Sequence, residues 1–458
     1  MLWRHLCLVR AWSAGLVGGL LILATATATA QTKRPADSEN TAPPPAVVTE
    51  TVDLLQANTA GQLNVVARGQ GQDRVRLSIR NTSGKRLNVV IPPGLVASAA
   101  ASQGPGGPGG RGGGGFQSMG LGMFSNRPGS FGMFQGSNSS GFQSVPVNDP
   151  SRVPAVTVPA GESIDLAVPA VCLNFGLPTP TFRNVFTLMD VEKYSSDPRV
   201  SKSLRSLCLL GTSHGVAQAV MWRVCNDLPF ETMAAEAGKI MNLAEIALAS
   251  HFVEALGAAT DSEPVDSASL AEGRLFVRIQ GEGALARDAK RLNDQIPNYR
   301  LLGLPVRALE NGELPAAAAP ALYVRVILTD SKIGETRGQI QVSSCLMPDQ
   351  WTPLGKTSFH DTSSLTVLDG ETMARSLDRA LAAAFVTVKP ARRSVGSTTL
   401  KVENHLPFTL QSVSVRAGNS AGAPTVPFQA IGLGPVRSAL LPIQAATATI
   451  DRVELNGL

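Results

Sequence analysis

A glycine-rich segment at residues 104–141 constrains the fold of this 458-residue chain more than any other feature. It holds 15 glycines and three prolines among 38 residues, and its only charged residues are Arg111 and Arg127. Such a composition buries too little apolar surface to offset the entropy lost when a backbone becomes ordered. We therefore expect a long disordered insertion in a loop, where added length costs little closure entropy.

Short apolar motifs recur within and just beyond this Gly/Phe/Met-rich segment. The sequence GFQS at residues 115–118 returns at 141–144, and GMF at 122–124 returns at 132–134. Apolar side chains spaced along a flexible chain favour association, either with a second copy of the protein or with a component of the cell envelope. The near absence of charge argues against polyanion binding by the segment itself.

The first 30 residues have the layout of a secretory signal peptide. A basic start is followed by an apolar run at residues 11–23 and by small residues that end in Ala28-Thr29-Ala30. We expect cleavage after Ala30 and an exported protein that is periplasmic, surface-bound or extracellular, with no membrane span after cleavage. The alternative is an uncleaved membrane anchor, because residues 11–30 are almost long enough to span a bilayer.

Export would place the cysteines in an oxidising compartment, where disulfides persist. Cleavage removes Cys7, and the remaining four allow three pairings, among which the sequence does not choose. The candidate disulfide cysteines are Cys172, Cys208, Cys225 and Cys345. We expect no metal site and no cofactor, because there is no C-x-x-C motif and no histidine at ligand spacing beside a cysteine.

The pattern of the remaining chain predicts a multidomain α+β protein. Residues 31–46 are polar, end in prolines and predict a disordered linker. Residues 47–176 show strict alternation at Val75, Leu77 and Ile79 and frequent turn signals, which predict an antiparallel β-sandwich carrying the insertion at 104–141. Capping residues and helical periodicity predict a helical unit at 190–258. Residues 272–390 predict an α+β domain whose sheet is covered by helices on one face. Residues 398–458 predict a C-terminal all-β region.

Basic residues gather on the outer face of the predicted strand at residues 74–80 and in the turn that follows. This face would bind a polyanion such as an acidic envelope polysaccharide or lipid headgroups. The alternative is a solvated sheet face or an edge charged against aggregation. Nucleic acid is not expected, since the formal charge of +5 falls by two when the signal is removed. The residues are Arg74, Arg76, Arg80, Lys85 and Arg86.

One face of the predicted helix at residues 214–226 carries His214, Gln218, Trp222 and Cys225. The sequence VAQAVMW at 216–222 resembles the T-Q-x-A-I-W segment of thioester domains from bacterial surface adhesins, and VCLN at 171–174 resembles their cysteine segment. The resemblance implies an internal thioester between Cys172 and Gln218, open to attack by host amines. The alternative is that Gln218 and Trp222 pack the helix against the β-domain while Cys172 forms a disulfide with Cys208 or Cys225.

Sequence motifs for enzymatic chemistry are weak. There is no G-x-S-x-G or H-E-x-x-H motif, and Gly355-Lys356-Thr357 lacks the first glycine of a phosphate loop. The pattern G-x-G-x-x-A at residues 281–286 brings the charge of Glu282 to the place a pyrophosphate would occupy. We therefore expect a non-enzymatic exported cell-envelope protein that acts in binding or assembly. The alternatives are a covalent adhesin and an exported hydrolase without a recognisable motif.

Overall fold

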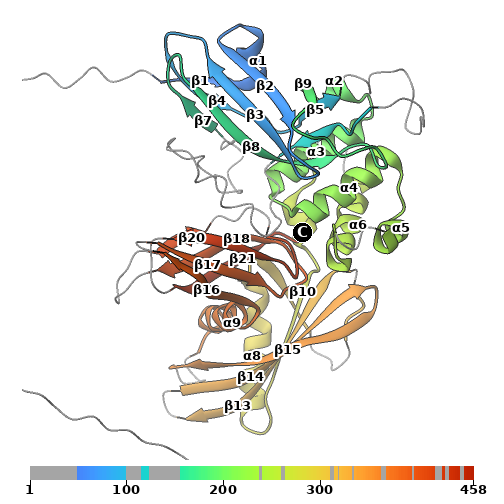
Figure 1. Cartoon of the computed structure of the whole chain (residues 1–458). Coiled ribbons are helices and arrows are strands. Elements are labelled where there is room, and N and C mark those ends of the chain that lie inside the picture. Colours follow the sequence, from blue (N-terminus) through green and yellow to red (C-terminus); the bar gives the residue numbers. More distant parts are fainter. Residues whose placement is uncertain are drawn as a thin grey trace, which may run out of the picture. The chain divides into compact units, whose positions relative to one another are not determined.

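The computed structural model of the protein describes residues 49–99, 115–122, 155–236, 240–258, 264–309, 314–317, 319–332, 335–362, 368–394, 397–417, 425–428, 433–443 and 448–458 (Figure 1). The expected signal peptide at 1–30 and the expected linker at 31–46 lie outside these residues, as do residues 104–114 and 123–141 of the Gly/Phe/Met-rich segment.

A closed antiparallel barrel forms the N-terminal part of the described chain, with the strand order β2-β3-β8-β6-β5-β9. On β3 the side chains of Val75, Leu77 and Ile79 are fully buried, while the alternate positions face outward. This follows from the period of two along a strand, which sends successive side chains to opposite faces. The strands are β2 (Leu63–Gly69), β3 (Arg74–Asn81), β5 (Leu95–Ala99), β6 (Met119–Leu121), β8 (Ser163–Cys172) and β9 (Val185–Asp190).

The barrel corrects two expectations, the sandwich and a fully disordered insertion. Strand β6 comes from inside the Gly/Phe/Met-rich segment and pairs with both β5 and β8, which closes the sheet on itself. The three residues of β6 are buried, and Met119 and Leu121 supply apolar surface to the barrel. The average composition of the whole glycine-rich segment does not predict this local apolar stretch. Strand β9 lies beyond the expected boundary at residue 176 and joins β2 to β5.

A separate three-stranded sheet, β1-β4-β7, accompanies the barrel. Strand β1 (Thr49–Asp53) runs parallel to β4 (Arg86–Val90), and β7 (Ala155–Val158) runs antiparallel to β4. The short helix α1 (Leu54–Thr59) follows β1, and the Asp53 side chain caps it by accepting hydrogen bonds from two backbone N–H groups.

Helices follow the barrel in the order that the capping signals predict. Asp197 caps α3, Pro198 occupies its first turn, and Gly211 ends it with a φ of 66°. Glycine adopts this left-handed conformation without steric cost, which explains the stop. The helices are α2 (Val191–Tyr194), α3 (Pro198–Leu210), α4 (His214–Asn226), α5 (Phe230–Glu236), α6 (Leu243–Ala258) and α7 (Ser267–Ala271).

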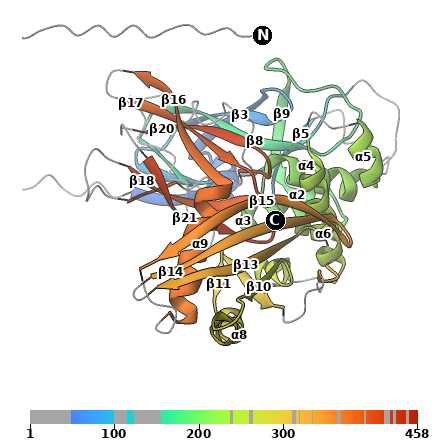
Figure 2. The same cartoon turned by 90° about the horizontal axis from the view of Figure 1, so that it is seen from below.

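A mixed six-stranded sheet follows, with the order β11-β12-β10-β13-β14-β15. Helix α8 (Leu285–Gln295) connects the parallel strands β10 and β12, and α9 (Gly370–Phe385) packs on β15 and touches α8. Figure 2 shows the long strands β13–β15 side by side with α9 next to them. The strands are β10 (Leu275–Gln280), β11 (Arg300–Leu301), β12 (Leu304–Ala308), β13 (Ala321–Lys332), β14 (Glu335–Met347) and β15 (Gln350–Asp361).

The C-terminal region contains two three-stranded antiparallel sheets, β16-β17-β20 and β19-β18-β21. Helix α9 contacts β15 on one side and β16 and β21 on the other (Figure 1). Buried apolar residues from Leu54 to Leu458 belong to one contiguous cluster. The strands are β16 (Val386–Ser394), β17 (Ser397–Asn404), β18 (Leu410–Ala417), β19 (Thr425–Phe428), β20 (Ser438–Ile443) and β21 (Ala448–Leu455).

Candidate functional site

The structure brings Cys172 and Gln218 together, although they are 46 residues apart. Cys172 is the last residue of β8, and Gln218 lies in the middle of α4. The Gln218 side-chain oxygen Oε1 accepts a hydrogen bond from the backbone N–H of Cys172 at 2.8 Å, and its Nε2 donates to the backbone carbonyl of Cys172 at 2.9 Å. The amide therefore binds the main chain of Cys172 on both its polar groups, as a neighbouring strand would.

The Cys172 thiol takes no part in this contact. Its Sγ donates to the backbone oxygen of Gln72 at 3.4 Å. Burial raises the pKa of the thiol to about 12, and the negative charge of Asp73 adds to the shift. Since the thiolate is the nucleophilic form of cysteine, the raised pKa keeps Cys172 in the less nucleophilic thiol form at neutral pH.

The other side chains on this face of α4 also hold the end of β8. His214 Nε2 lies 3.0 Å from the carbonyl oxygen of Ala170, and Trp222 packs edge-to-face on Phe175 with ring centroids 4.9 Å apart. Asn226, at the end of α4, bonds the backbone of the same loop. These contacts pack α4 against the barrel.

All four candidate disulfide cysteines are free thiols in the structure. They lie on four elements, β8, α3, α4 and β14, and Cys345 belongs to a smaller core cluster apart from the main one. The thiols of Cys172, Cys208 and Cys345 each bond a nearby backbone carbonyl. Burial raises the pKa of Cys208 and Cys225 to about 12 as well.

The basic face of the barrel is partly neutralised by its own neighbours. Arg76 forms a bidentate pair with Asp165 on the adjoining strand β8, with a closest distance of 2.7 Å. This bond and a second from the Ser78 hydroxyl lower the pKa of Asp165. Lys85 pairs with Glu50 at 2.9 Å, and Arg74 lies 4.0 Å from Asp73.

Two members of this face, Arg80 and Arg86, form no ion pair within the described part of the chain. Strand β3 pairs with β2 on one side and with β8 on the other, so it is not an edge strand and its arginines do not prevent edge-to-edge aggregation. The five residues lie on or next to β3 and β4, and their charge is divided between internal pairs and solvent.

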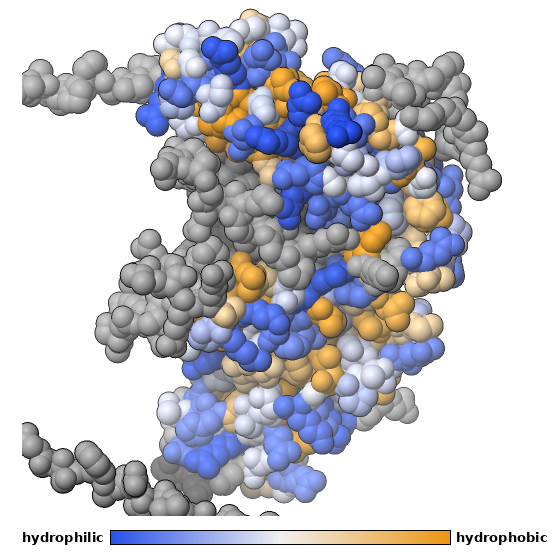
Figure 3. Space-filling view, in the orientation of Figure 1, coloured by the Kyte–Doolittle hydropathy of each residue, from blue (hydrophilic) through white to orange (hydrophobic). Residues whose placement is uncertain are grey.

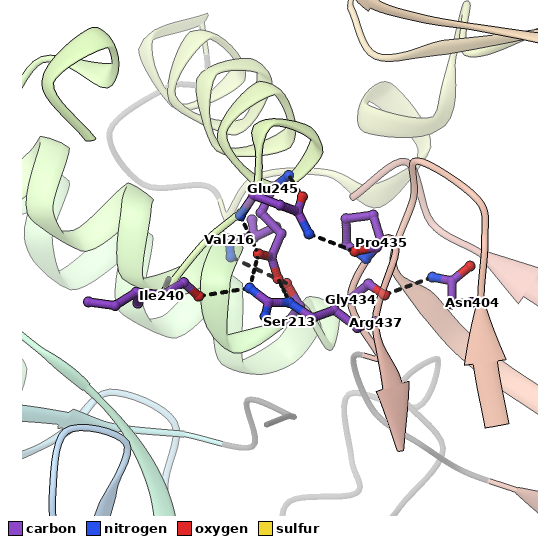
Figure 4. Close-up of polar contacts among 9 residues, drawn as sticks. Ser213, Val216, Ile240, Glu245, Asn404, Gly434, Pro435 and Arg437 are labelled. Atoms are coloured by element: carbon purple, nitrogen blue, oxygen red, sulfur yellow. Dashed lines mark hydrogen bonds and ion pairs between the residues drawn. The ribbon is translucent and has the colours of Figure 1, made fainter. Parts of the chain in front are cut away.

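A buried carboxylate, Glu245, is the centre of a polar cluster that the sequence analysis missed (Figure 4). Its side chain is 1% exposed. Its Oε1 accepts a hydrogen bond from Nε of Arg437 at 3.2 Å, and its Oε2 accepts one from Nη2 of Arg437 at 2.6 Å. Ser213 Oγ donates to Oε1 at 3.1 Å, and the backbone N–H of Asn242 donates to Oε2 at 2.9 Å. The cluster thereby joins the starts of α4 and α6 to the segment before β20.

Two glycines make room for the Glu245 carboxylate. A Cβ on Gly215 would collide with its carboxyl carbon, and a Cβ on Gly434 would lie 2.7 Å from Oε1. The N-x-x-E spacing of Asn242 and Glu245 forms a reciprocal capping box, which a search for helix starts can find. The partner Arg437 is 192 residues away and leaves no such signal. With its oxygens bonded to three residues, this carboxylate is a structural anchor.

An exposed apolar loop lies between β8 and β9, at residues 173–184. Phe182 is 70% exposed, and Val185, at the start of β9, is 50% exposed. The loop is held to the Gly/Phe/Met-rich segment by Gln117, whose backbone N–H donates to Pro178 and whose side chain donates to Leu177. In Figure 3 hydrophobic surface gathers in patches over the barrel strands.

Comparison with models of known protein families gives no match, and comparison with characterised proteins gives none. Within the described ranges, no group of three His, Cys, Asp or Glu residues is placed to hold a metal ion. No helix of the described part of the chain is both long and apolar enough to cross a membrane.

Proposed function

We propose that the protein is a non-enzymatic, exported component of the cell envelope that acts in binding or assembly. The apolar loop at residues 173–184, together with Val185, carries the proposal. Phe182 is 70% exposed and Val185, three residues along the chain, is 50% exposed, and exposed apolar side chains that gather on a surface mark interaction sites.

The position of this loop supports a role for the Gly/Phe/Met-rich segment in the same interaction. Gln117, close to residue 115 where the described part of the segment begins, is bonded to the loop through two hydrogen bonds. The repeated phenylalanines and methionines of residues 122–134 follow directly in sequence. Loop and segment together offer apolar side chains for self-association or for an envelope partner.

Sedimentation velocity of the protein lacking residues 1–30 tests the proposal. We expect the sedimentation coefficient of the parent protein to rise with concentration. Replacing Phe124, Phe131 and Phe134 with serine removes three apolar side chains while keeping the chain length, and we expect the rise to weaken or disappear.

The matched control replaces Asn126, Gln135 and Asn138 with serine in the same segment. These changes leave the apolar side chains in place, so association should equal that of the parent. If the parent stays monomeric at every concentration and retains no envelope component, or if both triple variants associate equally, the proposal fails.

A second candidate, a covalent adhesin with a Cys172–Gln218 thioester, is favoured by the contact between these two residues. Thioester formation joins Sγ of Cys172 to the side-chain carbonyl carbon of Gln218 and releases the amide nitrogen as ammonia. It requires the thiol to turn from Gln72 toward the amide. Intact-mass measurement decides: a thioester predicts a mass lower by one ammonia and addition of methylamine, whereas an unshifted mass in both conditions ends this candidate.

A further inference from the structure

The face of the β10–β15 sheet opposite α8 and α9 carries four basic side chains, Arg278, Arg307, Arg325 and Lys356. Residues 314–317 cover the end of this face near Trp351 and Cys345. The four basic side chains alternate with the core positions of their strands, so they point away from the face on which α8 and α9 pack. Arg307, Arg325 and Lys356 are exposed and Arg278 is half-buried. In Figure 3 hydrophilic surface predominates over β13–β15. We refer to these four residues as the basic sheet face.

Strand register places three of these cations in one line. Arg278 on β10 is directly opposite Arg325 on β13, Arg325 is opposite Gln341 on β14, and Gln341 is opposite Lys356 on β15. Neighbouring strands are about 4.8 Å apart, so the line crosses about 14 Å of sheet. Arg307 lies one strand away from Arg278, with its guanidinium over the Phe276 ring at 5.9 Å.

On the barrel, carboxylates such as Asp165 and Glu50 form ion pairs with part of the basic face, but the basic sheet face has no such carboxylates among its described neighbours. None of the four forms an ion pair within the described part of the chain. Glu335, at the far end of the face, is already paired with Arg337 at 2.8 Å and His360 at 3.4 Å. Like charges directly opposite each other destabilise a sheet, so Arg278 and Arg325 lower the stability of the fold. An anion bound across the line would remove that repulsion.

We propose that the basic sheet face binds an acidic polysaccharide, a chain of sugars that bear carboxylates. Guanidinium groups bind carboxylates with two parallel hydrogen bonds. Gln280 holds Arg325 in place by accepting from its Nε at 2.6 Å, and Gln341 offers an amide between Arg325 and Lys356 for sugar hydroxyls.

The aromatic side chains of the same face favour a sugar polymer over a membrane. Trp351 is partly exposed and packs with Phe276 and Tyr323 at centroid distances of 6.2 and 6.0 Å. Phe276 and Tyr323 are themselves buried, so they are not available for insertion into a lipid layer. The half-exposed indole beside the cationic line suits the apolar face of a sugar ring.

Binding of the protein lacking residues 1–30 to immobilised polygalacturonate tests this inference. We expect binding that weakens as salt is added, because exposed charges are screened. Replacing Arg278, Arg325 and Lys356 with glutamine should raise the Kd roughly tenfold. Each exposed charge pair that is lost raises the Kd by about twofold, and the three factors multiply. The same variant should melt at no lower a temperature than the parent, because repulsion is removed; a purely structural role predicts a lower melting temperature.

The matched control removes three exposed charges from the helices on the other face of the sheet, with Arg287 and Lys290 of α8 and Arg379 of α9 changed to glutamine. We expect its Kd to equal that of the parent. The inference is overturned if polygalacturonate does not bind at low salt, if neutral dextran binds equally well, if both triple variants lose affinity equally, or if the protein binds only vesicles containing anionic lipids or only nucleic acid. Self-association of the sheet variant should be unchanged, which separates this result from the proposed function.

Discussion

At the scale of single residues, the contact between Gln218 and Cys172 shows how one side chain can serve two interpretations. The amide satisfies a buried N–H and a buried C=O at the end of β8. Removing it with Gln218→Ala leaves both backbone groups without partners, which costs about 2–4 kcal/mol of unfolding free energy. Cys172→Ala keeps both bonds and loses only a small buried side chain, so we expect a cost of about 1 kcal/mol. Urea denaturation of the two variants measures the difference; equal losses would contradict a role through the main chain.

His251 on α6 makes the stability depend on pH. Its Nε2–H donates to the Leu270 carbonyl at 3.2 Å, and its Nδ1 accepts from the Arg274 guanidinium, so the ring is neutral. Burial, followed by the positive charge of Arg274, lowers the pKa of His251 from 6.5 to about 4. Between these values the unfolded chain binds a proton and the folded chain does not, so stability is complete above pH 6.5 and falls toward pH 4.

The loss attributed to His251 reaches up to about 3 kcal/mol at pH 4. His251→Gln removes the titrating group, and its stability should change less between pH 7 and pH 5 than that of the parent. Chemical denaturation at several pH values measures both curves. Parallel curves over this interval would show that another group controls the acid response.

At the scale of elements, the packing of β6 against α3 depends on Gly120. A Cβ at Gly120 would lie 2.9 Å from Cδ1 of Leu204 on α3, so the barrel and the helix meet where a side chain is missing. Gly120→Val should therefore destabilise the protein by about 1–3 kcal/mol. Gly84→Val is the control, because no atom lies within 4 Å of its Cβ position. Thermal unfolding distinguishes them, and equal melting temperatures would mean that β6 is not packed against α3.

The helices could be predicted from the sequence because their signals are local. Asp197 and Gly211 bound α3, and Asp369 caps α9, each acting within one turn of its own helix. Strand β15 gives no comparable signal, since it is an edge strand with few buried positions and contains Pro353. Edge strands tolerate proline and polar residues on both faces, so their pattern is weak.

At the scale of the whole molecule, the candidate sites depend on contacts between distant segments. Gln218 reaches β8, Arg437 reaches α6, and four strands align Arg278, Arg325 and Lys356. Sequence periodicity assigns a side chain to a face of its own strand or helix, but it does not state which strand lies next to which. The barrel was missed for the same reason, because β6 closes it from within a glycine-rich segment.

The Glu245–Arg437 ion pair connects the helical region to the C-terminal strands, so its loss should lower the free energy of unfolding of the whole protein. Glu245→Ala leaves the partly buried Arg437 guanidinium without its carboxylate, which costs about 3 kcal/mol. The double variant Glu245→Met with Arg437→Met removes both charges and should recover part of this loss. Urea denaturation with two spectroscopic probes measures it. A cost below about 1 kcal/mol for Glu245→Ala would contradict a buried, uncompensated charge.

Fractionation of the cells that produce the protein tests the account as a whole most directly. We expect a protein that lacks residues 1–30 and is retained with the envelope fraction. The variant Phe182→Ser with Val185→Ser, altered only at the exposed apolar surface, should move from that fraction to the soluble exported fraction. A full-length protein recovered from the cytoplasm, or equal envelope retention of parent and variant, would contradict the account.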